Sequence, residues 1–450
     1  MVLESQARES DVVSHLAAGA GAAEDTHIPD DKSGKSAEYD EVEGQEIQPP
    51  DGGFRAWSVV LGAWCVQFVA YGIGNSFGTF QSYYSEHQLV GLSADTVSWI
   101  GSLQLFLLLF GGSFVGPLFD AYGARWLVFS GSVLYIFSFF ILSACRRYYQ
   151  FIIVHGILLG IASTLMFHPA MAATSHYFDK RKALAMGIVV TGGGVGGVVL
   201  PLLLSNLFEK LGYGWTIRVL AFIFLAFLIV ANLTIKALLP PRKPTPILQT
   251  FQGLKEANLV LLTAGSWFFS LGLITPYFFL PGYAQVIGSG TTFSLYCITF
   301  LSVGSVVGRV VMGFFSDRLG RFNVFVACLL ISGILVLAMW LHCTSTATLI
   351  AFAVLFGFFT GGCESLVPAC AGQISSQRMT GNRLGLMWAI GSFASLVSGP
   401  IGGALVAHSS LSGHEGYSGA IIFSGVAFFI SAVCILASRL ATDRRIFAVV

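Results

Sequence analysis

Two residues with ionisable side chains, Arg309 and Glu364, stand in the middle of long apolar stretches of the sequence. A charged side chain in the hydrocarbon core costs roughly 2.5–3.5 kcal/mol for Arg on translocon scales, so such residues pair with each other or with a ligand. At about 1.5 Å per helical residue, both lie roughly 10–12 Å from the same end of their predicted helices. We therefore predict an ion pair in which Arg309 can bind an anion. Glu364 either carries a proton or only neutralises Arg309.

Four uncharged polar residues are weaker candidates for the same work. Tyr71 and Asn75 are four positions apart and share a face of one predicted helix. His155 and His168 lie together in another apolar stretch, and a histidine can titrate near neutral pH. A buried, hydrogen-bonded structural histidine is the commoner case. With Arg309 and Glu364, these residues make up the predicted substrate-binding or proton-coupling set.

The helices that must position these residues follow from composition. Of the 450 residues, 55% are hydrophobic and 10% are charged, whereas a soluble domain carries roughly a quarter charged residues. About 20 apolar residues span a bilayer, and twelve such stretches occur, at roughly 56–80, 95–117, 125–145, 150–174, 183–206, 216–239, 257–283, 292–316, 321–342, 347–372, 381–406 and 417–440. The sequence predicts an all-α polytopic membrane protein with twelve transmembrane helices in two six-helix halves.

The segments outside the helices divide the chain further. Residues 1–51 hold 13 of the 23 acidic residues and few large apolar ones, so we expect a disordered acidic tail over 1–55. The halves are predicted at 56–239 and 257–440, with a Pro-rich linker at 240–256 and a C-terminal tail at 441–450. Fifteen Lys and Arg residues fall in the loops and tail on one side and four on the other. The positive-inside rule then predicts cytosolic termini, and we expect the plasma membrane.

A loop pattern recurs at one position in each half. Gly116, Asp120 and Gly123 each have a counterpart 197 positions later, and an arginine closes each copy. Asp at a helix end can pair with a neighbouring helix terminus or an Arg, while glycines permit the tight turn. We expect a cytosolic gate, against the simpler interpretation of a solvated turn, formed by Gly116, Asp120, Gly123 and Arg125 with Gly313, Asp317, Gly320 and Arg321.

The loop pattern resembles the signature of the major facilitator superfamily, Gly-x-x-x-Asp-x-x-Gly-x-Arg/Lys. The resemblance implies two repeated halves around a central cavity that opens alternately to each side of the membrane. Two further segments, Pro50–Trp57 and Tyr177–Gly187, look like the paired signatures of the monocarboxylate porter family, especially its fungal members.

Two positions depart from the lactate-carrying animal members of that family. Where those members have a lysine, this chain has Asn75. Those members also have an Asp four residues before an arginine that corresponds to Arg309, and here that position is Ser305. Both departures argue against lactate–proton symport by that mechanism.

Three function hypotheses remain open. The first is a gradient-coupled carrier of a small organic acid or related anionic metabolite. The second is an efflux carrier for a larger, fungal-type specialised metabolite, and the third is a non-transporting membrane sensor with a carrier fold.

The sequence offers little support for other classes of function. It holds no nucleotide-binding loop, nucleophile–base set or metal-ligand cluster, and its eight Cys are scattered through apolar runs. We expect no enzyme activity, cofactor, metal or nucleic-acid partner. The expected partners are a small-molecule substrate, the lipid bilayer and protons, and protein partners stay undetermined.

Overall fold

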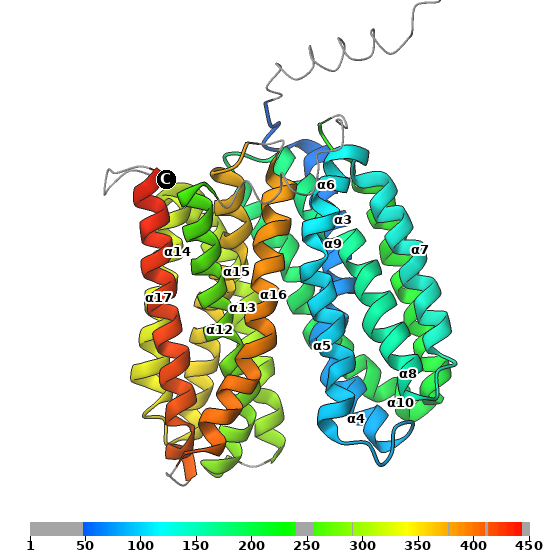
Figure 1. The fold of residues 1–450 in the computed structure, drawn as a ribbon, viewed down its shortest axis with the longest axis vertical. Helices are drawn as coiled ribbons and strands as arrows, with labels where there is room; N and C mark the ends of the chain where they lie inside the picture. Colours follow the sequence, from blue (N-terminus) through cyan, green and yellow to red (C-terminus); the bar gives the residue numbers. More distant parts are fainter. Residues whose placement is uncertain (1–47, 240–254, 290, 377–378, 410–412, 443–450) are drawn as a thin grey trace, which may run out of the picture. The chain divides into compact units, whose positions relative to one another are not determined.

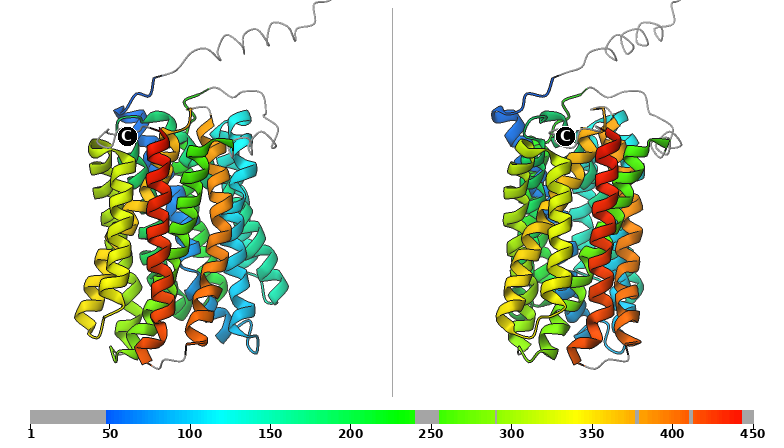
Figure 2. Two further views of the ribbon diagram at one scale, coloured as in Figure 1. Left: turned by 60° about the vertical axis from the view of Figure 1, so that its left-hand side comes forward. Right: turned by 90° about the vertical axis from the view of Figure 1, so that its left-hand side faces the viewer.

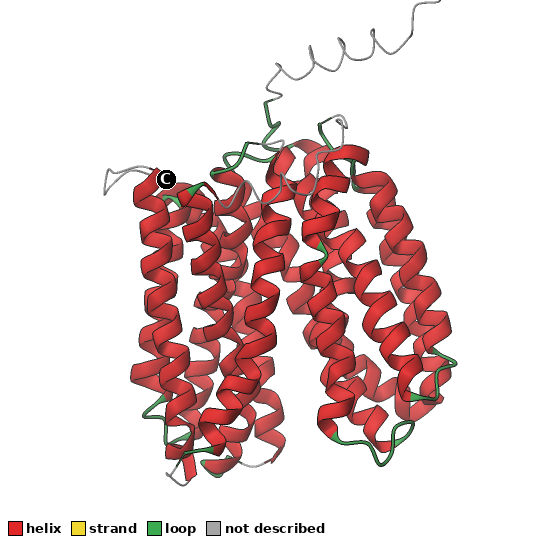
Figure 3. Ribbon diagram, in the orientation of Figure 1, coloured by secondary structure: helices red, strands yellow, loops and turns green. Residues whose placement is uncertain are grey.

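The computed structural model describes residues 48–239, 255–289, 291–376, 379–409 and 413–442. The described part of the chain is helical, with short loops between helices and no strand (Figure 3). The predicted acidic tail up to residue 47, the linker over 240–254 and the C-terminal tail from 443 lie outside the described residues.

Residues of the first half form one group of helices (Figure 1). A seven-residue π-helix, η1, precedes α9, and α10 is the longest element. The bounds are α3 (Gly53–Asn75), α4 (Phe77–Glu86), α5 (Ala94–Phe110), α6 (Gly112–Tyr122), α7 (Ala124–Leu142), α8 (Tyr148–Phe151), η1 (Ile152–Leu158), α9 (Leu159–Tyr177) and α10 (Lys182–Thr234).

The second half repeats this plan with six long elements. Figure 2 shows α17 beside α12 and α16, and the three helices pack against one another. The bounds are α12 (Ala257–Val286), α13 (Thr291–Leu319), α14 (Arg321–Ile334), η3 (Leu335–Trp340), α15 (Thr346–Gln373), α16 (Thr380–Ala407), η5 (Gly413–Tyr417) and α17 (Ser418–Thr442).

Ten of the described helices are long and apolar enough to cross a membrane, or eleven if a bent pair in α5 and α6 counts as one span. Helix α10, with 53 residues, covers two of the predicted spans. The chain turns between them at Gly212, whose φ of 68° is unfavourable for residues with a Cβ. With α10 divided there, the twelve predicted spans are accounted for, and the all-α polytopic fold is confirmed.

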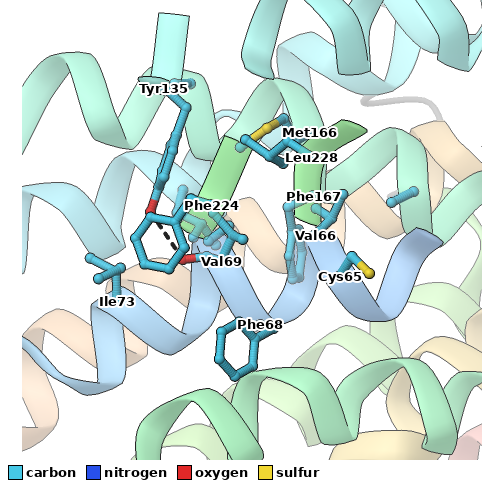
Figure 4. Close-up of a cluster of buried hydrophobic side chains, with 14 of the residues drawn as sticks. Cys65, Val66, Phe68, Val69, Ile73, Tyr135, Met166, Phe167, Phe224 and Leu228 are labelled. Atoms are coloured by element: carbon cyan, nitrogen blue, oxygen red, sulfur yellow. Dashed lines mark hydrogen bonds between the residues drawn. The ribbon is translucent and has the colours of Figure 1, made fainter. Parts of the chain in front are cut away.

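Each half has its own hydrophobic core. In the first half, side chains from α3, α7, α9 and α10 meet around Tyr135 (Figure 4). The buried Tyr135 hydroxyl donates a hydrogen bond of 3.0 Å to the carbonyl oxygen of Val69. Because a buried hydroxyl without a partner is costly, this bond fixes α7 against α3.

Glycines set the closest helix contacts in both halves. A methyl group added at Gly72 of α3 would lie 3.0 Å from the Cα of Gly196 in α10, so the two backbones meet directly. A methyl group at Gly357 of α15 would lie 2.9 Å from the carbonyl carbon of Leu301 in α13. Membrane helices gain little from hydrophobic burial against one another, and small residues that allow close packing take its place.

Replacing Gly357 with alanine should therefore destabilise the protein, because the added methyl forces α13 and α15 apart. Overpacking of this kind costs about 1–3 kcal/mol, and we expect the thermal midpoint of the detergent-purified protein to fall by several degrees. The matched control is Gly403→Ala in α16, where an added Cβ meets nothing within 4 Å. An equal fall in both variants would contradict the packing explanation.

Candidate functional site

Arg309 of α13 and Glu364 of α15 form the predicted ion pair. Nη2 of Arg309 donates a hydrogen bond to Oε2 of Glu364. Nη1 of Arg309 donates a second bond, of 2.6 Å, to the carbonyl oxygen of Val190 in α10. Arg309 is 3% exposed, and the Glu364 side chain is 17% exposed. The carboxylate is thus the more accessible member of the pair, and the bond from Arg309 to Val190 joins the pair to the first half.

Glycines make room for this pair. A methyl group added at Gly194 of α10 would lie 2.8 Å from Nη1 of Arg309, so the guanidinium occupies the space that a side chain would take. A methyl group at Gly361 of α15 would lie 2.6 Å from the Cα of Ser305 in α13. The Gly-rich run of α10 and the close α13–α15 contact therefore have a local reason, which is to bring a buried arginine to its partners.

The ion pair lines a cavity of about 690 Å³ between the two halves. Tyr71 and Asn75 of α3 line the same cavity, so four of the six predicted site residues come together there. Arg309 and Glu364 are the only charged residues among its described lining. The rest is mainly aromatic, aliphatic and hydroxyl-bearing, and includes Trp99, Phe106, Ile274, Tyr277, Phe278, Phe279, Ser302, Ser305 and Leu396.

A smaller cavity of about 140 Å³ shares Tyr71, Arg309 and Glu364 with the larger one. Its other lining residues include Gln67, Met171 and Trp388. Gln67 and Trp388 lie nearer the first residues of α3 and α16 than the residues of these helices that line only the larger cavity. The ion pair and Tyr71 therefore lie at the boundary between the larger and the smaller cavity.

The two predicted histidines do not line either cavity. Nδ1 of His155 shares a 2.9 Å hydrogen bond with the Tyr84 hydroxyl, and its ring packs edge-on against Phe77 and Phe80. The ring N–H of His168 donates to the carbonyl oxygen of Leu108 at 2.9 Å. Both rings are buried. The His155 ring lies among helices of the first half, whereas the His168 ring also packs against Trp388 of α16, with 5.2 Å between the ring centroids.

Several cavity residues had no sequence signal as site residues. Tyr277 of α12 and Ser305 of α13 line the large cavity. Ser305 stood out only as a departure from a family pattern. Gln67 and Trp388 stood in apolar stretches like many other residues, and only the crossing of the helices reveals that they face the cavity.

The second copy of the loop motif joins the two halves. The carboxylate of Asp317 accepts hydrogen bonds from the backbone N–H groups of Ala183, at 3.1 Å, and Leu184, at 2.9 Å. These are unsatisfied donors in the first turn of α10, where an anion is favoured. Arg321 pairs with Asp317 at 3.0 Å and also donates to the backbone carbonyl of Asp179. We call the end of the protein with these contacts the gate end.

The first copy of the motif packs differently in detail. Gly116 lies against Asn382 in the first turn of α16, as Gly313 lies against Ala183 in the first turn of α10. Asp120 is buried, whereas Arg125 is exposed. Arg321 follows Asp317 by four residues, one helical turn, and reaches it. Arg125 follows Asp120 by five residues, more than one helical turn.

The family model described as Major Facilitator Superfamily matches residues 63–309 and 260–446. The chain belongs to the Major Facilitator Superfamily. It is therefore an integral membrane transporter, and its expected two-half architecture is that of its family.

Relatives from fungi resemble this transporter over most of their length. It is 38% identical to the MFS transporter asaE of Aspergillus flavus over 87% of this chain and 89% of the relative. It is 37% identical to the aspyridones efflux protein apdF of Emericella nidulans, over 88% and 80%. It is 35% identical to the fujikurins efflux protein of Gibberella fujikuroi, over 90% and 87%.

Solved structures of the superfamily share the fold at low sequence identity. A proton:xylose symporter matches with a TM-score of 0.69 and 13% identity, over 85% of this chain and 95% of that chain. The human organic anion transporter MFSD10 matches with a TM-score of 0.69 and 14% identity, over 86% and 100%.

The gate contacts predict unequal effects for the two motif arginines. Arg321→Gln should lower the maximal transport rate about tenfold, because it removes charge-assisted bonds worth about 1.5–3 kcal/mol, yet leave the half-saturating substrate concentration nearly unchanged. Arg125→Gln, the matched change at the exposed position, should have little effect. Transport kinetics in reconstituted vesicles measure both quantities, and similar losses in the two variants would contradict the unequal roles.

Proposed function

We propose that this transporter exports a specialised metabolite that is larger than a short monocarboxylic acid and carries one acidic group. The observation that supports this proposal most directly is the cavity of about 690 Å³, which has a single ion pair in a mainly apolar lining. Pockets of roughly 300–1,000 Å³ suit drug-sized ligands. A short acid such as lactate would fill a small part of this volume and leave most of the aromatic lining without a partner.

The named relatives support export. Two of them, at 37% and 35% identity over most of their length, are named as efflux proteins for aspyridones and fujikurins. Those names concern those proteins. For this transporter they favour a specialised metabolite as the substrate and export as the direction of transport. The shape of this transporter's cavity would determine which metabolite it exports.

A carrier of a small organic acid is the second candidate. Arg309 would serve such a substrate equally well, and the segments Pro50–Trp57 and Tyr177–Gly187 resemble the monocarboxylate porter signatures. In the structure these two segments touch, because the Asp51 carboxylate accepts N–H bonds from Asp179 and Lys180. That contact supports membership of this branch as part of the proposal, while the cavity volume disfavours a short acid.

In the proposed cycle, Arg309 exchanges partners. Its guanidinium is bonded to Glu364 in the structure, and the acidic group of the substrate would replace the carboxylate. Glu364, the more exposed member, would be free to carry a proton. The gate end would face the cytosol, as the Lys and Arg distribution favours, and export would require the plasma membrane. His155 and His168 would have structural roles.

Removing the members of the pair should separate their roles. Arg309→Ala should still fold but lower export by roughly a hundredfold, since truncating one partner of a buried charge pair costs about 2–5 kcal/mol. Glu364→Gln should keep substrate binding and weaken the dependence on a pH gradient, because the ionisable group is gone. Normal export by Arg309→Ala would exclude Arg309 from the site.

The double variant is the control for a purely structural pair. Arg309→Ala with Glu364→Gln should restore any lost expression without restoring export. If both single variants fail to fold and the double variant transports normally, the pair only stabilises the fold.

The substrate class is tested by efflux from preloaded vesicles. Acids of increasing size, from lactate to amphipathic acids with aromatic or long alkyl groups, should leave faster from vesicles with the wild type than from those with Arg309→Ala. We expect the difference to be largest for the bulky acids. Faster Arg309-dependent transport of lactate than of any bulky acid would favour the second candidate.

A further inference from the structure

Asp51, two residues before α3, holds the loop between α9 and α10. Its Oδ1 accepts hydrogen bonds from the backbone N–H groups of Asp179, at 2.6 Å, and Lys180, at 2.8 Å. Its own N–H donates to the carbonyl oxygen of Tyr177 at 3.0 Å. Three bonds from one residue therefore hold the last residue of α9, Tyr177, and two residues of the loop, Asp179 and Lys180.

The backbone of Asp51 is strained in the conformation that makes these bonds. Its φ is 51°, and it is the only residue other than glycine with a positive φ in the described part of the chain. Asp and Asn tolerate this region better than other residues with a Cβ, but it is still unfavourable. Such strain persists when the surrounding contacts outweigh it, and here they are the contacts to the loop.

The same loop makes the gate contacts to the second half. Arg321 donates to the carbonyl oxygen of Asp179, and Lys182 donates to the carbonyl oxygen of Gly372 at 3.2 Å. Asp317 accepts from the N–H groups of Ala183 and Leu184, directly after the loop. The loop and the first turn of α10 are therefore held by Asp51 from their own half and by three residues of the other half, Asp317, Arg321 and Gly372.

One peptide group receives both sets of contacts. The carbonyl of Asp179 and the N–H of Lys180 belong to the same peptide bond, and in a trans peptide they point in opposite directions. The structure contains no cis peptide bond in its described part. By bonding the N–H on one side, Asp51 turns the carbonyl toward Arg321 on the other. Hydrogen bonds on both sides of one peptide also polarise each other.

We propose that Asp51 is a positioning residue of the gate, which stabilises the state that is closed at the gate end by orienting the Asp179–Lys180 peptide for Arg321. It acts through this peptide and is not itself a lining residue of either cavity. Removing its carboxylate shifts the protein toward states that are open at the gate end. The consequence is independent of the substrate, so it can be tested without knowing which molecule is exported.

The positive φ of Asp51 decides which substitutions can remove the carboxylate without disturbing the backbone. Asp51→Gly removes the carboxylate while allowing the positive φ at no cost. Asp51→Asn also tolerates the conformation and keeps a neutral oxygen that can accept a hydrogen bond, so it should have an intermediate effect. Gly52→Ala is the neighbouring control, because an added Cβ there meets nothing within 4 Å.

Two reporter cysteines distinguish a shift between states from unfolding. Ser270→Cys, the inner reporter, lies in the smaller cavity, and Ser102→Cys, the outer reporter, lies in the larger cavity. The protein is placed in lipid nanodiscs, where a water-soluble maleimide reaches both faces, and labelling of the native cysteines is subtracted. Asp51→Gly should raise the labelling rate of the inner reporter about tenfold, as expected for losing a bond to a charged group, and lower that of the outer one.

The remaining outcomes decide against the proposal or for it. Unchanged labelling in Asp51→Gly, or a rise at both reporters, would overturn it, the latter because local unfolding explains it. In a background of Arg321→Gln, Asp51→Gly should change the labelling rates little further, since both substitutions act on one peptide. Fully additive effects of the two substitutions would also overturn the proposal. Should Asp51→Gly not fold, Asp51→Asn must show the same opposite changes at smaller size, and their absence would be decisive.

Discussion

A charge inside a membrane needs a partner, and the centre of this transporter is arranged around that requirement for Arg309. Its guanidinium bonds to Glu364 and to the backbone of α10, so one side chain ties α13, α15 and α10 together. The glycines of α10 exist beside it because a larger residue would occupy its space. The tight α13–α15 contact brings Glu364 within reach. The two cavities meet at this pair, and any anion that enters either one encounters the same guanidinium.

At the gate end, charged side chains also have partners, but these partners are backbone groups. Asp317 satisfies the first N–H groups of α10, and Arg321 satisfies a carbonyl of the preceding loop. These bonds cross between the halves, whereas the large cavity lies between the halves on the other side of the ion pair. The polar contacts of Asp317 and Arg321 thus join the halves at one end, and we expect their loss to change which cavity is accessible.

The sequence predicts properties that depend on position along a helix better than those that depend on how helices cross. The depth of Arg309 and Glu364 and the spacing of Tyr71 and Asn75 were sufficient to bring these four residues to one cavity. Whether His155 faces that cavity depends on the rotation of its helix, and the structure buries it against Tyr84 instead. Gln67 and Tyr277 gave no signal because a polar or aromatic residue in an apolar helix has no fixed direction. The small-acid hypothesis followed from Arg309 and from the resemblance to monocarboxylate porters. The sequence could not test it against the cavity volume, which is a property of the assembled halves.

The central claim is that Arg309 exchanges Glu364 for the acidic group of the exported molecule. It is tested most directly by an experimental structure of the transporter with its exported metabolite bound. We expect an acidic oxygen of the metabolite at about 3 Å from the Arg309 guanidinium, with Glu364 no longer bonded to it. An intact Arg309–Glu364 pair, with the metabolite bound elsewhere in the cavity, would contradict the claim.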